Sequence, residues 1–277
     1  MSYDFELGRI YRMPTHFGPA PGPRQRPDGG RFDNRSDPYT LTAWLKWRAA
    51  AAATARHLPP GFTPASEPSV LVEWRQRRNL PWLAGRGYNI VVVSLAATPP
   101  SGGPAGRLQA VVWESLPDAV LTGREELGVP KLWADVSELR VDLRGGEVRA
   151  EASWLGFRFL EVTLSGLEED APEDRHDITG PDYYQWRYFP RPGTWGDPEV
   201  SYPTTTPGAV PDRRVQRSWR GHGALRLTAG TWEDLPTQHH VVAGLAGLAP
   251  SGAVAAGLVE TLGSRDLSDQ RPLEAAP

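Results

Sequence analysis

Two lysines stand out in a chain whose other basic residues are almost all arginine. Lysine and arginine together number 30, and only Lys46 and Lys131 are lysines. Arginine keeps its proton in proteins, whereas a lysine amine that is removed from water can become neutral and nucleophilic. Lys131, in the stretch GREELGVPKLWAD at residues 123–135, is therefore a candidate for covalent chemistry. The alternative is a surface lysine in a chain whose alanine, arginine, glycine and proline content reflects GC-rich coding.

Composition excludes several other kinds of site. The net charge is -3 and the arginines are scattered among acidic residues, so no basic surface for nucleic acid is expected. The chain has no cysteine, which rules out disulfides and a cysteine nucleophile. His239 and His240 are neighbours whose side chains point to opposite sides of an extended segment, and no third ligand has suitable spacing. We expect no metal and no cofactor, because phosphate loops and nucleotide fingerprints are also absent.

The two ends of the chain differ from its middle. The start, MSYDFELGRIYRMP, lacks the basic and apolar regions of a signal peptide, and no apolar run approaches 18 residues, so we expect a cytoplasmic protein without membrane contact. Proline and glycine predict an irregular arm over residues 1–38, and such arms often wrap a neighbouring subunit, which favours a homo-oligomer. Residues 39–265 are expected to form a single domain and residues 266–277 a flexible tail.

Short segments rich in β-formers dominate that domain. They predict strands at 39–47, 70–74, 88–98, 108–115, 138–156, 157–166, 183–190 and 224–232, with a hairpin at Arg144-Gly145-Gly146-Glu147. Helices are expected at 48–58 and, as a helix or a helical hairpin broken at Pro250-Ser251-Gly252, at 241–263. Strands with few helices between them predict an α+β fold. Its mainly antiparallel sheet is expected to close into a barrel or cone, with helices at the periphery and the C-terminus.

The segment around Lys131 resembles the acetoacetate decarboxylase superfamily. In LQAVVWESLPDAVLTGREELGVPKLWAD a strand leads to a Gly-Arg-Glu turn, a short helical segment and then Pro-Lys, and the resemblance implies that Lys131 is the Schiff-base lysine. SEPSVLVEW, PDYYQWRYFPRPG and DLPTQHHVVAG resemble further segments of the family in the same order, so the similarity extends over roughly residues 39–262. It implies a small keto acid as substrate.

The resemblance also assigns other residues of the site. Glu73 in VLVEW falls on a pocket carboxylate of the family. Arg35 in FDNRSD, or Arg24 in GPRQ, falls on the arginine that lies near the substrate carboxylate. Arg124 and Glu125 of the Gly-Arg-Glu turn are expected to be structural, because an arginine beside a turn commonly pairs with backbone carbonyls or with a carboxylate.

Two positions depart from the family's decarboxylases. Those enzymes place a second lysine after the nucleophile, where this chain has Leu132, and a glutamate two residues after a tyrosine, where Tyr88 is followed by Ile90. A Schiff base needs a neutral amine, and bringing a lysine pKa from about 10.4 to about 7 costs roughly 4 to 5 kcal/mol. Without the second cation, desolvation must supply most of this. The apolar residues expected to line the pocket are Trp82, Ile90, Val129, Leu132 and Trp133.

These features predict a lyase that forms a Schiff base with a keto acid on Lys131. An iminium accepts the electrons released when the substrate loses either CO2 or a proton. The departures favour the aldolase or dehydratase type, with Glu73 or Tyr88 moving protons through water. Two alternatives stay open: a β-keto acid decarboxylase, and a non-catalytic member of the fold that binds a small ligand while Lys131 pairs with its carboxylate.

Overall fold

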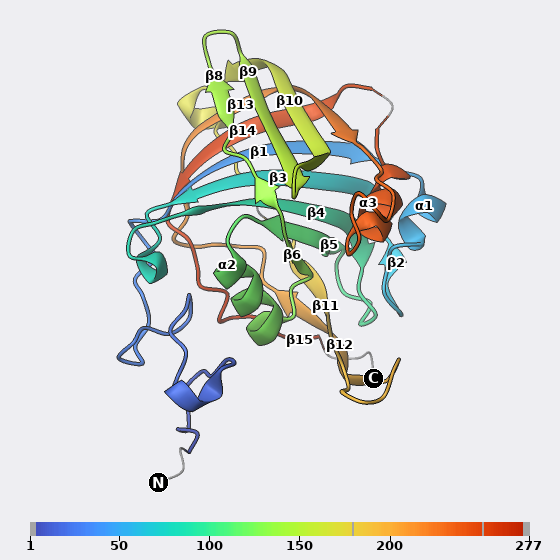
Figure 1. The fold of residues 1–277 in the computed structure, drawn as a ribbon. Helices are drawn as coiled ribbons and strands as arrows, with labels where there is room; N and C mark the ends of the chain where they lie inside the picture. Colours follow the sequence, from blue (N-terminus) through green and yellow to red (C-terminus); the bar gives the residue numbers. More distant parts are fainter. Residues whose placement is uncertain (1–3, 179, 251, 274–277) are drawn as a thin grey trace.

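One large sheet dominates the computed structural model of the chain, which describes residues 4–178, 180–250 and 252–273 (Figure 1). The strands are β1 Tyr39–Arg48, β2 Thr63–Pro64, β3 Ser69–Arg78, β4 Tyr88–Thr98, β5 Gly106–Glu114, β6 Lys131–Trp133, β7 Asp135–Val136, β8 Arg140–Asp142, β9 Glu147–Trp154, β10 Phe157–Glu169, β11 Tyr183–Pro190, β12 Pro198–Thr206, β13 Arg214–Leu227, β14 Val254–Leu262 and β15 Arg271–Pro272. The helices are α1 Ala51–Ala55, α2 Pro117–Thr122 and α3 His239–Ala246, and the shorter turns are η1 Thr15–Phe17, η2 Pro81–Leu83, η3 Gly123–Leu127 and η4 Pro172–Asp174.

The order of the strands confirms the α+β class with a mainly antiparallel sheet. Across the described residues the order is β15-β12-β11-β5-β4-β3-β1-β14-β13-β10-β9-β7, with β2 paired to β4, β6 to β5 and β8 to β9. Parallel pairing occurs where β5 meets β11 and β6. This path has two ends, β15 and β7, so the expected closure is not made by a hydrogen-bonded ladder.

Side chains pack on both faces of the central strands. On one face, Val91, Val93 and Leu95 of β4 belong to the main core with Trp74 and Trp113. On the other face, β4 contributes to a second cluster: Leu80, Tyr88, Ile90, Val92, Val112, Ala119, Leu127 and Val129. Because β4 is buried on both faces, its sequence is a nearly continuous apolar run. The second cluster includes Ala119 of α2 and Leu127 of η3, and Figure 1 shows α2 beside β5 and β6.

The predicted C-terminal helical hairpin is wrong in its second half. Residues 239–246 form α3, but Val254–Leu262 form strand β14 between β1 and β13. A Cβ at Gly257 would lie 2.4 Å from the Trp219 carbonyl oxygen and 2.8 Å from the Trp44 ring. The glycine and alanine content of this segment therefore fits close packing in the sheet rather than helix formation. Ser251, in the predicted break, lies outside the described residues.

Other predicted boundaries shift by a few residues. The helix expected at 48–58 is limited to Ala51–Ala55, while the strand expected at 224–232 begins ten residues earlier, at Arg214. The hairpin at Arg144-Gly145-Gly146-Glu147 is confirmed, since Asp142 pairs with Glu147 across β8 and β9. No helix in the described part of the chain has the length and apolar character needed to cross a lipid bilayer.

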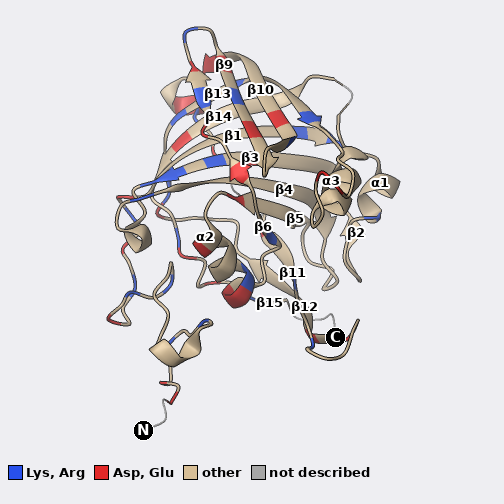
Figure 2. Cartoon of the chain, viewed as in Figure 1, with Lys and Arg blue, Asp and Glu red and all other residues tan. Residues whose placement is uncertain are grey.

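The outer strands carry intermingled charges. Figure 2 shows basic and acidic residues interspersed over β9, β10 and β13. Arg158 lies 3.3 Å from Glu151 and 3.1 Å from Glu161, and all three side chains are at least one-third exposed. Exposed pairs of this kind contribute little to stability.

Candidate active site

Lys131 is positioned by the connection between two parallel strands. Strand β5 leads into α2, which begins at Pro117, and then into the π-helical turn η3. Gly128, with φ 72°, ends the turn in the left-handed conformation that glycine tolerates best. The chain then returns beside β5 as β6, with Lys131 opposite Val112. Insertions of π-helical geometry often occur at functional sites.

The Lys131 amine contacts three oxygen atoms. Its Nζ lies 2.8 Å from Oε1 and 3.0 Å from Oε2 of Glu114, and it donates to the carbonyl oxygen of Ala119 at 3.0 Å. The side chains of Lys131 and Glu114 are 12% and 2% exposed. A lysine ammonium has three N–H donors, so these acceptors can take all of them. The Lys131 side chain is largely removed from water, as the sequence led us to expect. However, its amine contacts the Glu114 carboxylate and not only apolar side chains.

A glycine makes room for this arrangement. A Cβ at Gly123 would lie 2.3 Å from Cε and 2.6 Å from Nζ of Lys131. Arg124 then donates from Nη1 to the Lys131 carbonyl oxygen at 2.9 Å, which fits the structural role expected for it. The Gly-Arg pair thus fixes both the backbone and the side-chain path of the lysine.

The Lys131 side chain lines a pocket with a volume of about 170 Å³. Its apolar lining includes Leu80, Trp82, Ile90, Val92, Val112, Leu127 and Val129. Its ionisable lining comprises Arg24, Arg75, Arg77, Arg213, Arg265, Tyr88, Tyr183, Glu114, Lys131 and Asp266. Cations outnumber anions in this lining, so the pocket is suited to an anionic ligand.

The N-terminal arm supplies one of these arginines. Arg24 pairs with Glu126 through Nε at 2.7 Å and donates to the carbonyl oxygens of Thr122 at 3.3 Å and Asp266 at 3.1 Å. Three of its five N–H groups thus have partners in the protein. Thr122 precedes Gly123, so Arg24 approaches the pocket from the side where the lysine lies.

Arg35, the other arginine expected near a substrate carboxylate, lies outside the pocket lining in the described structure. Its Nη2 pairs with Asp33 at 2.8 Å, and its side chain is 69% exposed. The hydrogen bond from Arg35 lowers the pKa of Asp33 to about 2. Because Arg35 and Asp33 are only two positions apart in the sequence, Arg35 pairs with Asp33 and does not reach toward the pocket.

Glu73 lies behind the pocket wall rather than in it. Its residue exposure is 0%, its Oε1 accepts a hydrogen bond from Arg75 at 2.6 Å, and its Oε2 has no partner. Burial opposes the charge on Arg75, but the Glu73 carboxylate and the Tyr183 hydroxyl outweigh it and raise the Arg75 pKa above its usual range. Glu73 therefore contacts the pocket through Arg75.

The remaining predicted residues divide according to the faces of their strands. Tyr88, Trp82, Ile90 and Val129 line the pocket. Leu132 packs against the main core instead, because successive residues of a strand point to opposite faces. Trp133 is not among the residues that line the pocket in the described structure.

Sequence reasoning missed Glu114 and the pocket arginines Arg75, Arg77, Arg213 and Arg265. Glu114 ends a strand of apolar residues, which is a weak signal for a buried carboxylate. Its position beside the lysine depends on the parallel pairing of β5 with β6.

Comparison with known proteins assigns this fold. Residues 12–261 match the sequence model of acetoacetate decarboxylase (ADC). A structure of acetoacetate decarboxylase has a TM-score of 0.65 at 16% identity and covers 90% of this chain and 94% of that chain. An acetoacetate decarboxylase-like enzyme from Sphingomonas wittichii RW1 has a TM-score of 0.63 at 20% identity, with 88% and 95% covered. The enduracididine biosynthesis enzyme MppR, solved with pyruvate, has a TM-score of 0.60 at 18% identity, with 92% and 99% covered. The search of curated proteins found no match.

Proposed function

The chain belongs to the acetoacetate decarboxylase family, and from this premise we propose that it is a lyase that forms a Schiff base with a small keto acid on Lys131. The observation that carries the proposal is the contact of the Lys131 Nζ with both carboxylate oxygens of Glu114, at 2.8 and 3.0 Å, inside the pocket. A buried amine with a proton acceptor in contact can become a neutral nucleophile without any rearrangement of side chains.

The proposed reaction begins with proton transfer from the Lys131 ammonium to Glu114. The neutral amine attacks the keto carbon, and a proton moves from its nitrogen to the former carbonyl oxygen to give a carbinolamine. Glu114 then returns its proton to the hydroxyl group, which leaves as water, and an iminium remains. This cation withdraws electrons from the neighbouring carbon atoms.

Of the two reactions open to this iminium, we favour the aldolase or dehydratase type. Glu114 can take a proton from the carbon next to the iminium, and the resulting enamine can attack an aldehyde. Loss of water from the adduct gives an unsaturated product, and hydrolysis frees Lys131. MppR has been solved with the condensation product of pyruvate and imidazole 4-carboxaldehyde, which is the product type of such a reaction.

The pocket arginines support the same choice. Five of them line the pocket, Arg24, Arg75, Arg77, Arg213 and Arg265. Positive charge stabilises the substrate carboxylate and so opposes its loss as CO2, whereas a low-polarity site would favour that loss. Tyr88 lies in the same lining, and we propose that its hydroxyl moves protons to or from the substrate.

Reductive trapping tests the proposal. The protein is incubated with pyruvate and an aldehyde, or with acetoacetate, in the presence of borohydride, and its mass is then measured. We expect the reduced adduct on Lys131 and none in the Lys131→Ala variant. Following CO2 release against formation of an enone separates the aldolase or dehydratase from the decarboxylase. A folded wild-type protein that gains no mass would leave only the role of a non-catalytic binder.

A further inference from the structure

Arg77 differs from the other pocket arginines in its partners. Arg24, Arg75, Arg213 and Arg265 lie within 4 Å of the carboxylates of Glu126, Glu73, Asp177 and Asp269, respectively. Among the described residues, Arg77 has no carboxylate at that distance. Its Nη1 donates to the Tyr88 hydroxyl at 3.3 Å and its Nη2 to the Ser264 hydroxyl at 3.4 Å, both long contacts. A pocket-lining guanidinium with only neutral partners is an uncompensated positive charge.

Arg213 lines the same pocket and has unused hydrogen-bonding capacity. Its side chain is 11% exposed, and its Nη2 is buried without a hydrogen-bond partner. Burial lowers the Arg213 pKa, and repulsion from Arg75 adds to this effect, although Asp177 opposes both. The backbone just before Arg213 lies beside the segment that Arg77 contacts, because a Cβ at Gly263, next to Ser264, would lie 2.3 Å from the carbonyl oxygen of Asp212.

The strand register separates the Arg77 end of the pocket from the lysine. Glu114 of β5 lies opposite Ile90 of β4, which lies opposite Arg75 of β3. Arg77 lies opposite Tyr88, two residues further along the strands. With about 4.8 Å between strands and about 3.4 Å per residue, the backbones at Glu114 and Arg77 are roughly 12 Å apart. The carboxylate of pyruvate is bonded directly to its keto carbon, so a pyruvate held by Lys131 places that group near the lysine.

We propose that Arg77 and Arg213, with Ser264, form a second anion subsite that binds a carboxylate remote from the keto group, so that the preferred substrates are dicarboxylic keto acids. This inference rests on the proposed Schiff-base function and specifies its substrate class. Arg24, which approaches from the lysine side, is left for the carboxylate adjacent to the keto carbon. Between the two ends, the apolar side chains of Ile90 and Val92 face the pocket and suit the methylene chain of such a substrate.

The test compares 2-oxoglutarate, which has a second carboxylate, with pyruvate, which has none. The rate of borohydride trapping on Lys131 is measured at low concentrations of each acid for the wild type and for Arg77→Gln. We expect the wild type to prefer 2-oxoglutarate and Arg77→Gln to reduce that preference about 10- to 100-fold, because a charge-assisted hydrogen-bond pair is lost. Arg77→Lys, which keeps the charge, should recover part of it.

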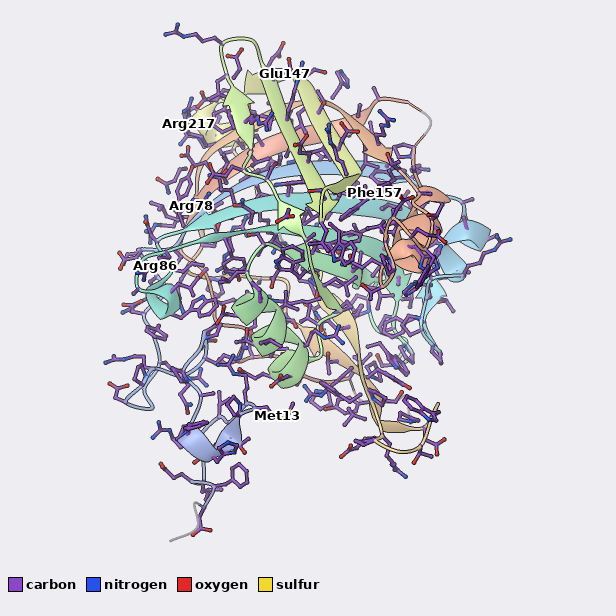
Figure 3. The ribbon with its side chains drawn as sticks, in the orientation of Figure 1. Met13, Arg78, Arg86, Glu147, Phe157 and Arg217 are labelled. Carbon is purple, nitrogen blue, oxygen red and sulfur yellow. The ribbon has the colours of Figure 1, made fainter. Side chains whose placement is uncertain are left out.

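Arg86→Gln is the matched control. Arg86 is an exposed arginine in the connection between β3 and β4, and Figure 3 labels it near Arg78 at the end of these strands. Its removal changes the net charge equally and should leave the preference intact. An unchanged preference in Arg77→Gln would overturn the subsite.

A second measurement tests the anion subsite separately from Schiff-base formation. Glutarate has two carboxylates and no ketone, and butyrate has one carboxylate. By calorimetry on Lys131→Met, we expect glutarate to bind at least about 10-fold more tightly than butyrate, and Arg77→Gln in this background to abolish the difference. Absence of trapping together with this result would refute the Schiff-base function alone. Trapping together with equal binding of glutarate and butyrate would refute the subsite alone.

Discussion

Replacing Gly123 by alanine should displace the Lys131 amine while barely disturbing the fold. Gly123 has φ -72° and ψ -36°, a helical conformation that alanine adopts readily. The new Cβ would lie 2.3 Å from Cε of Lys131, whereas ordinary contact begins at 3.4 Å. The lysine end must therefore retreat by about 1.1 Å. That movement takes Nζ away from Glu114 and Ala119, with which it makes contacts of 2.8 to 3.0 Å.

The expected effect is large on rate and small on stability. A misplacement of about 1 Å can cost about 100-fold in rate, so we expect trapping of pyruvate on Lys131 to slow by about that factor in Gly123→Ala. The clash involves the end of a flexible side chain, and alanine is favoured over glycine in helices by roughly 1 kcal/mol. The melting temperature should therefore change little. Gly103→Ala is the control, because the nearest atom to its Cβ would be the Ser101 Oγ, at 3.7 Å.

A double variant separates displacement from an unrelated loss of folding. In Lys131→Ala the atoms that clash are gone, so adding Gly123→Ala to that background should raise the free energy of unfolding by up to about 1 kcal/mol. Trapping in Gly123→Ala within about threefold of the wild-type rate would refute the reasoning. A fall in stability of the same size in both backgrounds would also refute it, because the clash would then lie elsewhere.

Three further predictions each depend on a particular contact in the structure. Glu114→Gln should slow trapping by about 100- to 10,000-fold because the proton acceptor is lost, and Glu138→Gln, at an exposed carboxylate, should not; equal rates would contradict the proposed role of Glu114. Arg24→Gln should weaken trapping of pyruvate about 10- to 100-fold relative to the exposed control Arg26→Gln, and an effect confined to the melting temperature would limit Arg24 to a structural role. Burial and then the hydrogen bond to Glu260 raise the pKa of Tyr39, so its protonated form contributes stability that is present below a pH of about 10 and is lost as the pH rises above that value. The free energy of unfolding should then fall less steeply above that pH in Tyr39→Phe than in the wild type, and parallel curves would exclude this contribution.

Local patterns predicted several strands, and they singled out Lys131, which lines the pocket, because these features depend on neighbours in the sequence. The central strand at 88–98 and the strand at 39–47 follow from runs of β-formers, and Lys131 follows from the segment around it. Leu132 could also have been placed, because alternation along a strand sends it away from the face that Lys131 occupies. The sequence analysis assigned Leu132 to the pocket because it follows Lys131 in the chain, whereas its side chain packs against the main core on the other face of the sheet.

The features that the sequence did not reveal depend on pairing between strands that are distant in the sequence. Glu114 and Lys131 meet because β5 and β6 run parallel, and no local pattern specifies that register. Arg75 and Arg77 recur at a spacing of two, but with Arg78 beside them they resemble a solvated charged strand. Only the neighbours Tyr88 and Ile90 on β4 identify the buried face. Similarly, the Gly- and Ala-rich segment of β14 favours a helix until its strand partners are known.

The contact between Lys131 and Glu114 changes how the absence of a second lysine is understood. A neighbouring cation promotes loss of a proton by repelling the ammonium, whereas Glu114 stabilises the ammonium and also accepts its proton. In the proposed reaction the resting site therefore holds an ion pair, and the bound substrate must favour the neutral pair. A substrate that displaces water from the pocket does this, because loss of solvation disfavours two charged groups more than two neutral ones. The amine thus becomes nucleophilic when the substrate is bound, and the pocket arginines hold that substrate without contacting Nζ.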